Sequence, residues 1–275
     1  MNNHEKALVT GASRGLGKAL ALELAMRGFH VIAGVRDPAS GADLLVRARD
    51  LPGVVELQQI DLAALDAYAP PAGLRVLINN AGYRGPYLPI EEAGTEEWRK
   101  TFETNFFGLI ELTRRAIPSL RQTGGGVICN IGSLGAYMPM PFYSIYRTSK
   151  AALAALSEGL RIELAPFGIR VIEIPIGGVD TDMLRSSIAH RPPDAIAYAH
   201  YRPMAEQQAA MPTQGRVNAI SPEEAARNVV DQLCLQGPLL RACDPNAVTG
   251  LAHIDSSTAE ERAQAMFARF DVTPA

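Results

Sequence analysis

The sequence is poor in the features that define several large classes of protein. Its 275 residues include three cysteines, Cys129, Cys234 and Cys243, and no two of them have the CxxC spacing of a redox or zinc site. We therefore expect buried thiols in a reducing compartment, the cytoplasm, and no metal site. No apolar run reaches the ~20 residues of a membrane-spanning helix, and the first apolar stretch is too short for a signal peptide, so no membrane span is expected.

The chain also lacks a strong charge of either sign. Its formal net charge is −3, from 26 Lys and Arg against 29 Asp and Glu, and the basic residues are spread along the chain. This distribution argues against nucleic acid or an anionic membrane as a partner and favours a small molecule. No linker-like stretch, internal repeat or low-complexity segment divides the sequence, so we expect one domain over residues 1–275.

What the sequence does contain is a series of apolar runs that alternate with helical patterns. Near-continuously apolar strands of this kind indicate a parallel sheet with helices on both faces, because each crossover must place a helix on one face. The expected strands are residues 6–10, 29–36, 54–60, 74–79, 126–131, 169–174 and, as a candidate seventh, 238–243. The main expected helices are residues 18–28, 95–122, 143–167, one that opens at Ser221-Pro222, and 258–270.

Residues 177–216 interrupt this alternation. They carry several prolines and scattered Met and Tyr residues, and they are too numerous for an ordinary connection. Because they follow the carboxyl end of the sixth expected strand, we expect a substrate lid at about residues 178–216.

A glycine-rich turn joins the first strand to the first helix. Gly11, Gly15 and Gly17 in TGASRGLG allow the backbone to pass close to a ligand, and the helix that follows directs its unpaired amides at an anion such as a pyrophosphate. A glycine-rich connection without a ligand is the alternative. The position of the turn, after a strand and before a helix, favours a dinucleotide site.

The end of the second strand bears on which dinucleotide binds. Arg36 could clamp a 2′-phosphate, and Arg14 in the glycine turn could approach it from the other side, which favours NADP(H). In the alternative, Asp37 accepts a hydrogen bond from a ribose hydroxyl and the cofactor is NAD(H). Asp61, at the end of the third strand, is expected to bind the adenine amine, or else to cap the next helix.

Three side chains suited to proton transfer lie between residues 133 and 150. Tyr146 and Lys150 are four residues apart, which places them on the same face of the expected helix. Ser133 follows the strand run GVICNI, so a strand end and a helix start are expected to meet at one site.

With these motifs in place, the sequence resembles the short-chain dehydrogenase/reductase family in its single-domain form. The motifs are TGASRGLG at 10–17, NNAG at 79–82, NFFG from Asn105, Ser133, and the Tyr146…Lys150 pair, all in the family's order. The resemblance covers the chain to about Thr181 and then loosens. It implies a Rossmann-like, doubly wound α/β fold with a parallel sheet of about seven strands.

The resemblance also implies a role for each catalytic residue. Tyr146 would be the general acid in carbonyl reduction and the base in alcohol oxidation, with Lys150 supplying the positive charge that a phenol needs near neutral pH. Ser133 would donate a hydrogen bond to the carbonyl oxygen. Asn105 would hold a relay water through its side chain or a local break in the helix. Separately, each residue could be structural: a cap, a core aromatic, a surface charge and a helix polar residue.

The same resemblance implies the cofactor contacts. The residues expected to bind it are Gly11, Ser13, Arg14, Gly15, Leu16, Gly17, Arg36, Asp61, Leu62, Asn80, Ala81, Gly82, Tyr146, Lys150, Val179 and Thr181. The sequence departs from the family at Pro175-Ile176-Gly177, where the proline of the usual Pro-Gly stands one place early. This departure affects the contacts expected with the carboxamide of the nicotinamide ring and the angle at which the lid begins.

These expectations together predict an oxidoreductase that transfers a hydride between NADP(H) and a hydrophobic ketone or secondary alcohol of steroid, aromatic or fatty type. Tyr83, Met140, Tyr143 and Met183 are the expected substrate contacts, although each could instead pack the lid onto the body. A non-catalytic NAD(P)-binding sensor or scaffold is the alternative, and a sugar-nucleotide epimerase is disfavoured by the GxxxGxG turn. Long helices rich in small apolar residues predict a homodimer or homotetramer.

Overall fold

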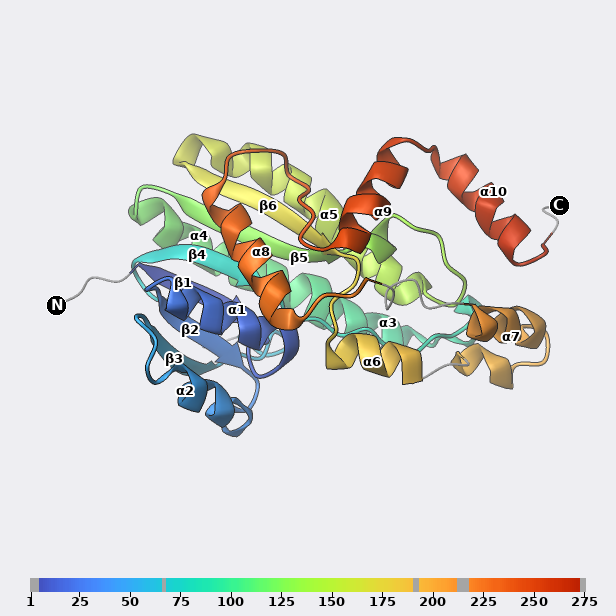
Figure 1. The fold of residues 1–275 in the computed structure, drawn as a ribbon, viewed down its shortest axis with the longest axis horizontal. Helices are drawn as coiled ribbons and strands as arrows, with labels where there is room; N and C mark the ends of the chain where they lie inside the picture. The colour runs from blue at the N-terminus through green and yellow to red at the C-terminus, as the bar shows by residue number, and fades with distance from the viewer. Residues whose placement is uncertain (1–4, 66–67, 190–192, 212–217, 273–275) are drawn as a thin grey trace.

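The structure is a computed structural model, and it describes residues 5–65, 68–189, 193–211 and 218–272. Its core is a six-stranded parallel sheet of order β3-β2-β1-β4-β5-β6 (Figure 1). The strands are β1 (Lys6–Thr10), β2 (His30–Val35), β3 (Val54–Gln59), β4 (Leu74–Asn79), β5 (Gly126–Ser133) and β6 (Ile169–Ile176). The expected α/β fold with a Rossmann-like parallel sheet is confirmed, and these six strands lie within two residues of their expected bounds.

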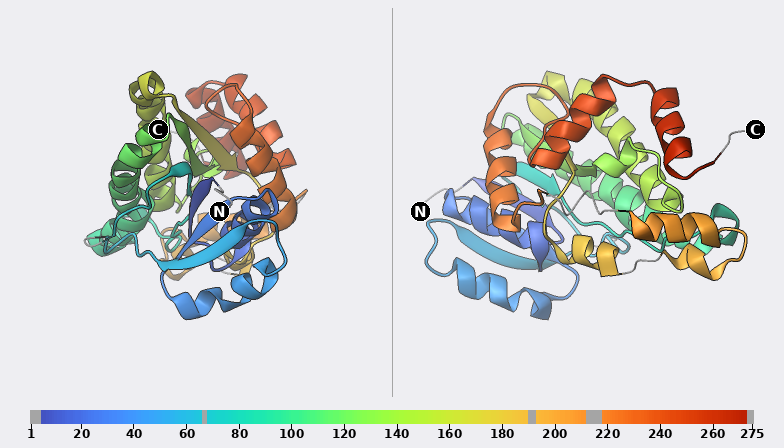
Figure 2. Two further views of the ribbon diagram at one scale, coloured as in Figure 1. Left: turned by 90° about the vertical axis from the view of Figure 1, so that its left-hand side faces the viewer. Right: turned by 45° about the vertical axis from the view of Figure 1, so that its right-hand side comes forward.

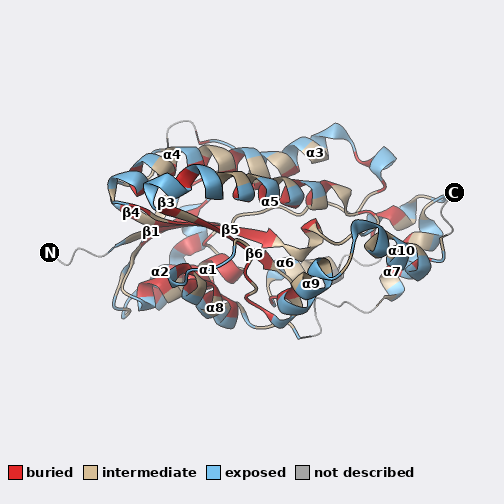
Figure 3. Ribbon diagram, turned by 90° about the horizontal axis from the view of Figure 1, so that it is seen from above, coloured by how far each residue is buried: buried red, intermediate tan, exposed pale blue. Residues whose placement is uncertain are grey.

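Helices cover both faces of the sheet. Figure 3 shows α4 and α5 on one side of it and α1, α2 and α8 on the other. The helices are α1 (Gly15–Met26), α2 (Ala42–Ala48), α3 (Thr95–Phe102), α4 (Gly108–Gln122), α5 (Ser144–Leu164), α6 (Asp182–Ala189), α7 (Arg202–Ala210), α8 (Pro222–Cys234), α9 (Pro245–Asp255) and α10 (Ala259–Arg269).

Alternation along each strand divides the buried side chains between two cores. In β1, Val9 packs into the core under α1 and α8, whereas Leu8 packs into the core under α4 and α5. Both side chains are fully buried, as expected for a central strand covered on both faces. The first core is built from Ala, Val, Leu and Ile, with two buried cysteines, Cys129 and Cys243. The third cysteine, Cys234, is exposed, so the expectation that the thiols are buried fails at this position.

The candidate seventh strand, residues 238–243, is not a strand. It makes a single parallel bridge to β6, in which Glu173 N donates to Leu239 O (2.9 Å) and Arg241 N donates to Glu173 O (3.0 Å). Pro238 has no amide to extend the ladder. The Arg241 guanidinium also folds back onto the carbonyls of Gln232, Leu235 and Pro238. The segment therefore covers the edge of β6 without extending the sheet.

The helix expected over residues 95–122 is interrupted. A π-helical turn, Glu103–Phe107, separates α3 from α4, while Pro118 lies inside α4. At the first residue of α4, a Cβ on Gly108 would lie 2.0 Å from Leu62 O, so only glycine permits this approach between the helix and the connection after β3. The interruption places Asn105 at the irregular turn.

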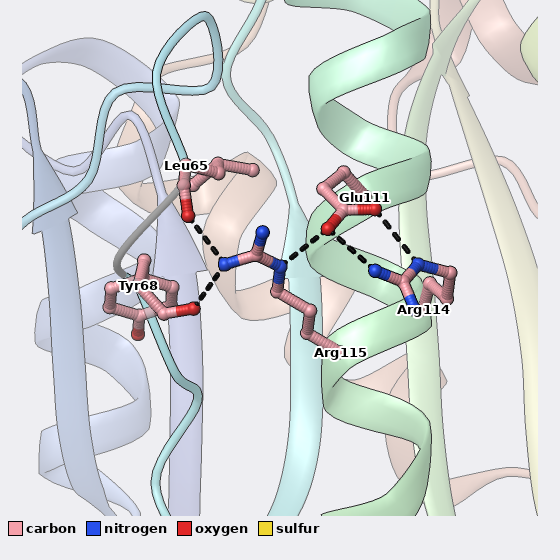
Figure 4. Close-up of polar contacts among 5 residues, drawn as sticks. All are labelled: Leu65, Tyr68, Glu111, Arg114 and Arg115. Atoms are coloured by element: carbon pink, nitrogen blue, oxygen red, sulfur yellow. Dashed lines mark hydrogen bonds and ion pairs between the residues drawn. The ribbon is translucent and has the colours of Figure 1, made fainter.

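Farther along α4, an arginine fixes the same connection between β3 and β4. The Arg115 guanidinium donates to the carbonyls of Leu65 and Tyr68 and pairs with Glu111, which also binds Arg114 (Figure 4). Two backbone carbonyls that lie away from any strand ladder thereby gain a charged donor. The connection is held against the helix that covers the sheet.

The last helices gather at the carboxyl end of the strands. Figure 1 shows α6, α7, α9 and α10 at this end, and Figure 2 shows the same grouping from another side. Helix α9 was not among the helices expected from the sequence. Pro245 occupies the first helical position and Asp244 caps it by accepting from Ala247 N (2.9 Å).

The described parts of the expected lid are α6, a 3₁₀ turn at Asp194–Ala197, and α7. Residues 190–192 and 212–217 of that range lie outside the described residues. None of the helices in the described part of the chain is long and apolar enough to span a membrane.

Candidate active site

Ser133 and Tyr146 meet at the carboxyl end of β5. Ser133 is the last residue of that strand, and its hydroxyl accepts a hydrogen bond from Gly135 N (3.1 Å). Tyr146 lies in the first turn of α5 and is 7% exposed. Burial raises the pKa of Tyr146 to about 12, and interaction with the Ser133 hydroxyl partly offsets that rise. In the protein alone the phenol therefore holds its proton at neutral pH.

Lys150 lies one helical turn farther along α5. Its Nζ donates to Ile131 O (2.9 Å) and stands 6.0 Å from the centroid of the Tyr146 ring. Burial lowers the pKa of Lys150 to about 8, and the negative charge of Glu173 acts in the opposite direction. Tyr146 and Lys150 therefore lie on the same face of α5, as predicted from their spacing, and the ammonium lies close to the phenol ring.

Asn105 is held entirely by protein groups. Its side chain accepts from Tyr83 N (2.7 Å) and donates to Tyr83 O (2.7 Å) and to Ser149 Oγ (2.9 Å). These bonds tie the loop after β4 to α5. Asn105 was expected to hold a water either through its side chain or through a local break in the helix. The side chain is already bonded to protein groups, whereas the break is present: in the π-helical turn, Gly108 N donates to Glu103 O.

The glycine turn has the shape that a bound pyrophosphate needs. Gly11 and Gly15 have positive φ (67° and 54°), and a Cβ on Gly17 would lie 2.2 Å from Gly11 O. The turn is fastened to the end of β4, because Asn80 Nδ2 donates to Thr10 O (2.9 Å). The start of α1, with its unpaired backbone amides, thus follows a turn whose glycines carry no side chains, a cradle that fits a dinucleotide phosphate.

Two further segments reach the same place. A Cβ on Gly15 would lie 3.4 Å from Thr181 Cγ2, and a Cβ on Gly82 would lie 3.8 Å from Lys150 Nζ. The residues expected to bind the cofactor after β4, after β6 and on α5 therefore border one region. Leu16 and Leu62 are buried, so neither offers an exposed side chain to a ligand.

Near the end of β2, the two carboxylates and the two arginines differ in whether protein groups already bind them. Asp37 caps a 3₁₀ turn by accepting from Ala39 N (2.9 Å), and Asp61 accepts from Ala63 N (3.0 Å). Arg14 and Arg36 are exposed, and no hydrogen bond or ion pair holds either guanidinium among the residues the structure describes. The Asp37 carboxylate is already committed to its turn, whereas the two arginines remain open to an anion.

An aromatic stack lies beside Tyr146. The Tyr143 ring centroid is 5.0 Å from that of Tyr146 and 5.2 Å from that of Tyr87, and Arg84 stacks over Tyr87 at 4.8 Å. Arg84 also donates to Tyr87 Oη (2.8 Å) and Ser187 Oγ (2.5 Å), which links the loop after β4 to α6. Sequence reasoning missed Tyr87. Its only signal was its position five residues after NNAG, in a loop that the fold returns to the site.

The other expected substrate contacts are less centrally placed. The Tyr83 ring lies under Lys100 Nζ (4.7 Å), so its side chain faces α3 while its backbone is held by Asn105. Met140 and Met183 are 38% and 40% exposed. Of the four residues proposed as substrate contacts, the structure brings Tyr143 into contact with Tyr146.

Comparison with known proteins agrees with this geometry. A family model for the short chain dehydrogenase matches residues 5–192. The chain belongs to the short-chain dehydrogenase family. An uncharacterized oxidoreductase of Bacillus subtilis, YusZ, is 38% identical over 216 residues, which are 72% of this chain and 75% of that one.

Two further members of the family are similar to this one. The rabbit (Oryctolagus cuniculus) 11-beta-hydroxysteroid dehydrogenase type 2 is 35% identical over 193 residues, 66% of this chain and 47% of the relative. A short chain dehydrogenase from Burkholderia cenocepacia, solved in complex with NADP, superposes with a TM-score of 0.73 at 29% identity, and 98% of each chain is covered. The oxidoreductase family and its fold are therefore established for this chain.

Proposed function

We propose that the protein is an NADP(H)-dependent oxidoreductase that acts on a hydrophobic ketone or secondary alcohol, with the substrate carbon bound beside Tyr146. The observation that carries this proposal is the meeting of Ser133, Tyr146 and Lys150 in a buried site that borders the glycine cradle. When bound, the nicotinamide cofactor supplies or accepts the hydride.

The protein's own residues handle the proton. In the direction of reduction, Tyr146 donates its phenolic proton to the carbonyl oxygen, which the Ser133 hydroxyl holds in place. The tyrosinate that results is stabilised by the Lys150 ammonium. In the direction of oxidation the same phenol must lose its proton before it can accept one. Positive charge near the ring then counteracts the burial that raises its pKa to about 12.

The preference for NADP(H) rests on the end of β2. Arg36 and Arg14 are exposed at the edge of the cradle, while the carboxylate of Asp37, the competing ribose ligand, is engaged by Ala39 N. A 2′-phosphate would gain two charge-assisted partners there. The NADP complex of the Burkholderia relative supports the same preference, and NAD(H) is the alternative cofactor.

The substrate class follows from the aromatic stack. Tyr143 and Tyr87 offer flat, apolar surface directly beside the proposed proton donor, which suits a steroid, aromatic or fatty carbonyl compound. The name of the rabbit relative, a hydroxysteroid dehydrogenase, supports this class. Residues 178–216 would close over the compound as a lid of the single domain.

We also propose a cytoplasmic homodimer or homotetramer. Phe107 and Ile162, on the outer side of the layer formed by α3, α4 and α5, are 54% and 76% exposed. A second copy packed against this layer would remove such apolar surface from water.

The test is a comparison of Tyr146→Phe with the unaltered protein on a panel of hydrophobic ketones and alcohols, assayed with NADPH and with NADH. We expect kcat/KM to fall by about 10²–10⁴-fold, the usual contribution of a positioned acid or base, while cofactor fluorescence shows unchanged binding. Tyr68→Phe is the control, because it removes another partly buried phenol, whose hydroxyl bonds to Gln58 on β3 and not to a group on β5 or α5. In the same assay Arg36→Leu should weaken NADPH binding by roughly 10-fold and leave NADH unaffected.

Full turnover by Tyr146→Phe would exclude Tyr146 as the proton donor. If the unaltered protein bound the cofactor but turned over none of the compounds in the panel, the non-catalytic sensor or scaffold would be favoured instead.

A further inference from the structure

Glu173 is a fully buried carboxylic acid that the proposed chemistry does not use. It stands in the middle of β6, with 0% of its surface exposed, because residues 239–241 bond to its backbone and cover the sheet edge. In register it pairs with Asn130 of β5, so its side chain lies on the same face of the sheet as α5. An uncompensated carboxylate at such a position is costly, which calls for an explanation.

The space around the carboxyl group is shaped for it. A Cβ on Gly132 would lie 2.4 Å from Glu173 Oε1, so the acid extends across the residue that precedes Ser133. Tyr137 donates its phenolic hydrogen to the same oxygen (3.3 Å). Oε2 is buried and has no hydrogen-bond partner among the residues that the structure describes. The carboxylate therefore has one weak donor and no arginine or backbone amide to balance its charge.

The balancing charge comes from the active site. Lys150 Nζ bonds to Ile131 O, and Ile131 pairs with Ile174, the residue after Glu173. The ammonium and the carboxylate lie on the same side of neighbouring strands, and each acts on the pKa of the other: the lysine lowers that of Glu173, and the carboxylate raises that of Lys150. No direct ion pair joins them among the described residues, so they interact through the field of a dry interior.

The other ionisable groups around Glu173 do not supply this charge. Tyr137, which burial keeps neutral, and Glu158 on α5 both act on Glu173. Of the other ionisable groups on neighbouring segments, Cys129 belongs to the opposite core, and the Arg241 guanidinium is bonded to backbone carbonyls of Gln232, Leu235 and Pro238. Glu158 is exposed and negative, and it disfavours the ionised form of Glu173.

We propose that Glu173 is a positioning residue for the oxidoreductase reaction, whose carboxylate keeps the buried Lys150 in its charged form behind Tyr146. This role rests on the proposed function. It concerns the charge of one lysine, however, and can be measured without turnover.

The direction of the effect follows from the two burial shifts. Burial lowers the pKa of Lys150 to about 8 and raises that of Glu173 to about 7. Above about pH 7 the carboxylate is ionised and helps the lysine keep its proton, whereas below that pH the lysine is charged without help. Removing the carboxylate should therefore make Lys150 lose its proton at a lower pH.

The decisive measurement is an NMR titration of the cofactor-free protein labelled with 13C at the lysine ε-carbon. The chain has four lysines, so Lys6, Lys18 and Lys100 serve as internal references and Lys150→Met assigns the fourth signal. In Glu173→Gln we expect the Lys150 midpoint to move down by about 1 pH unit, the lower end of what a nearby opposite charge produces.

Glu158→Gln is the matched control, because it removes the same charge from an exposed position on the helix that carries Lys150. Its Lys150 midpoint should change by less than about 0.3 unit, as expected for a solvent-screened charge. An unchanged or raised midpoint in Glu173→Gln would overturn the proposal.

Tyr137→Phe provides a second test should Glu173→Gln fail to fold. It removes the hydrogen bond that favours the ionised carboxylate, so a smaller downward shift of the Lys150 midpoint is expected and no shift contradicts the proposal. With a confirmed substrate, the alkaline limb of the pH profile of kcat/KM in Glu173→Gln should move to lower pH by the same amount as the Lys150 midpoint in the NMR titration. Absence of turnover in every variant would count against the proposed function, while the titration still decides the role of Glu173.

Discussion

The two faces of the sheet are stabilised in different ways. Under α1 and α8 the strands present apolar side chains such as Val9 and Ile78, fully buried in one continuous core. Under α4 and α5 the same strands also carry buried polar groups, and these form a directed chain. Asn79 Nδ2 donates to Asn130 Oδ1 (2.8 Å), Asn130 Nδ2 donates to Ser157 Oγ (2.8 Å), and Ser157 in turn donates to the carbonyl of Leu153.

This difference explains where the chemistry lies. An apolar face tolerates small adjustments in packing, whereas hydrogen bonds in a dry interior fix the relative positions of strand and helix. Lys150, Asn105 and Glu173 all belong to the polar face, and α5 must hold its position against β5 if Tyr146 is to meet Ser133. The apolar face supports the sheet, and the polar face aligns the reacting groups.

The largest effect that separates the two faces should come from the first residue of the polar chain. Asn79→Leu keeps the branched shape of the side chain but leaves Asn130 Oδ1 and Thr113 Oγ1 buried without the donor they share. We expect a loss of about 3 kcal/mol in unfolding free energy, measured from the denaturant midpoint. The control is Ile78→Val, the neighbour that faces the other core, with an expected loss of about 1 kcal/mol. Equal losses would remove the distinction between the faces.

A smaller effect is expected at the carboxyl end of β1. Thr10 Oγ1 accepts from Asn80 N and Ala81 N, both at 3.0 Å, and Thr10 is 1% exposed. Thr10→Val should cost about 2 kcal/mol by orphaning two amides, and the loosened loop should also weaken cofactor binding in a fluorescence titration. Thr10→Ser keeps the acceptor and should retain the affinity. If serine and valine bind cofactor alike, the hydroxyl does not position the loop.

The smallest effect tests whether hydrogen bonds also contribute to stability on the partly exposed side of α4. Arg115 is 22% exposed and donates to two loop carbonyls, whereas Arg114 is 69% exposed and binds only Glu111 among the described residues. Arg115→Ala should lower the melting temperature by an amount equivalent to about 1 kcal/mol, and Arg114→Ala by about 0.3 kcal/mol or less. A larger loss in Arg114→Ala would show that the surface pair, and not the loop contact, matters.

The local part of the architecture could be predicted from the sequence. Apolar runs located the six strands, and the spacing of Tyr146 and Lys150 placed both on one face of α5, because these patterns depend on neighbours only a few residues away. Helix α9 was not predicted, and the apolar run at residues 238–243 was predicted as a candidate strand but forms only a single bridge to β6.

The contacts that depend on folding could not be predicted. Asn79 belongs to the recognised NNAG motif, but its bond to Asn130 joins residues 51 positions apart. Glu173 had no sequence signal beyond an acidic residue in an apolar strand, and its meaning comes from the charge of Lys150 on the same side of the sheet. Tyr87 became a candidate only when the loop after β4 folded back onto Tyr143. In each case the partner is set by tertiary structure.

The strand order has a consequence for how the chain is made. The central strand β1 pairs with β2 on one edge and with β4 on the other, so its second edge has no partner until residues 74–79 have left the ribosome. At ~5–20 residues per second the wait lasts several seconds, during which a short apolar strand presents open backbone groups. Until then one edge of β1 is open to pairing with a strand of another chain, so its buried position in the finished sheet is what closes this edge.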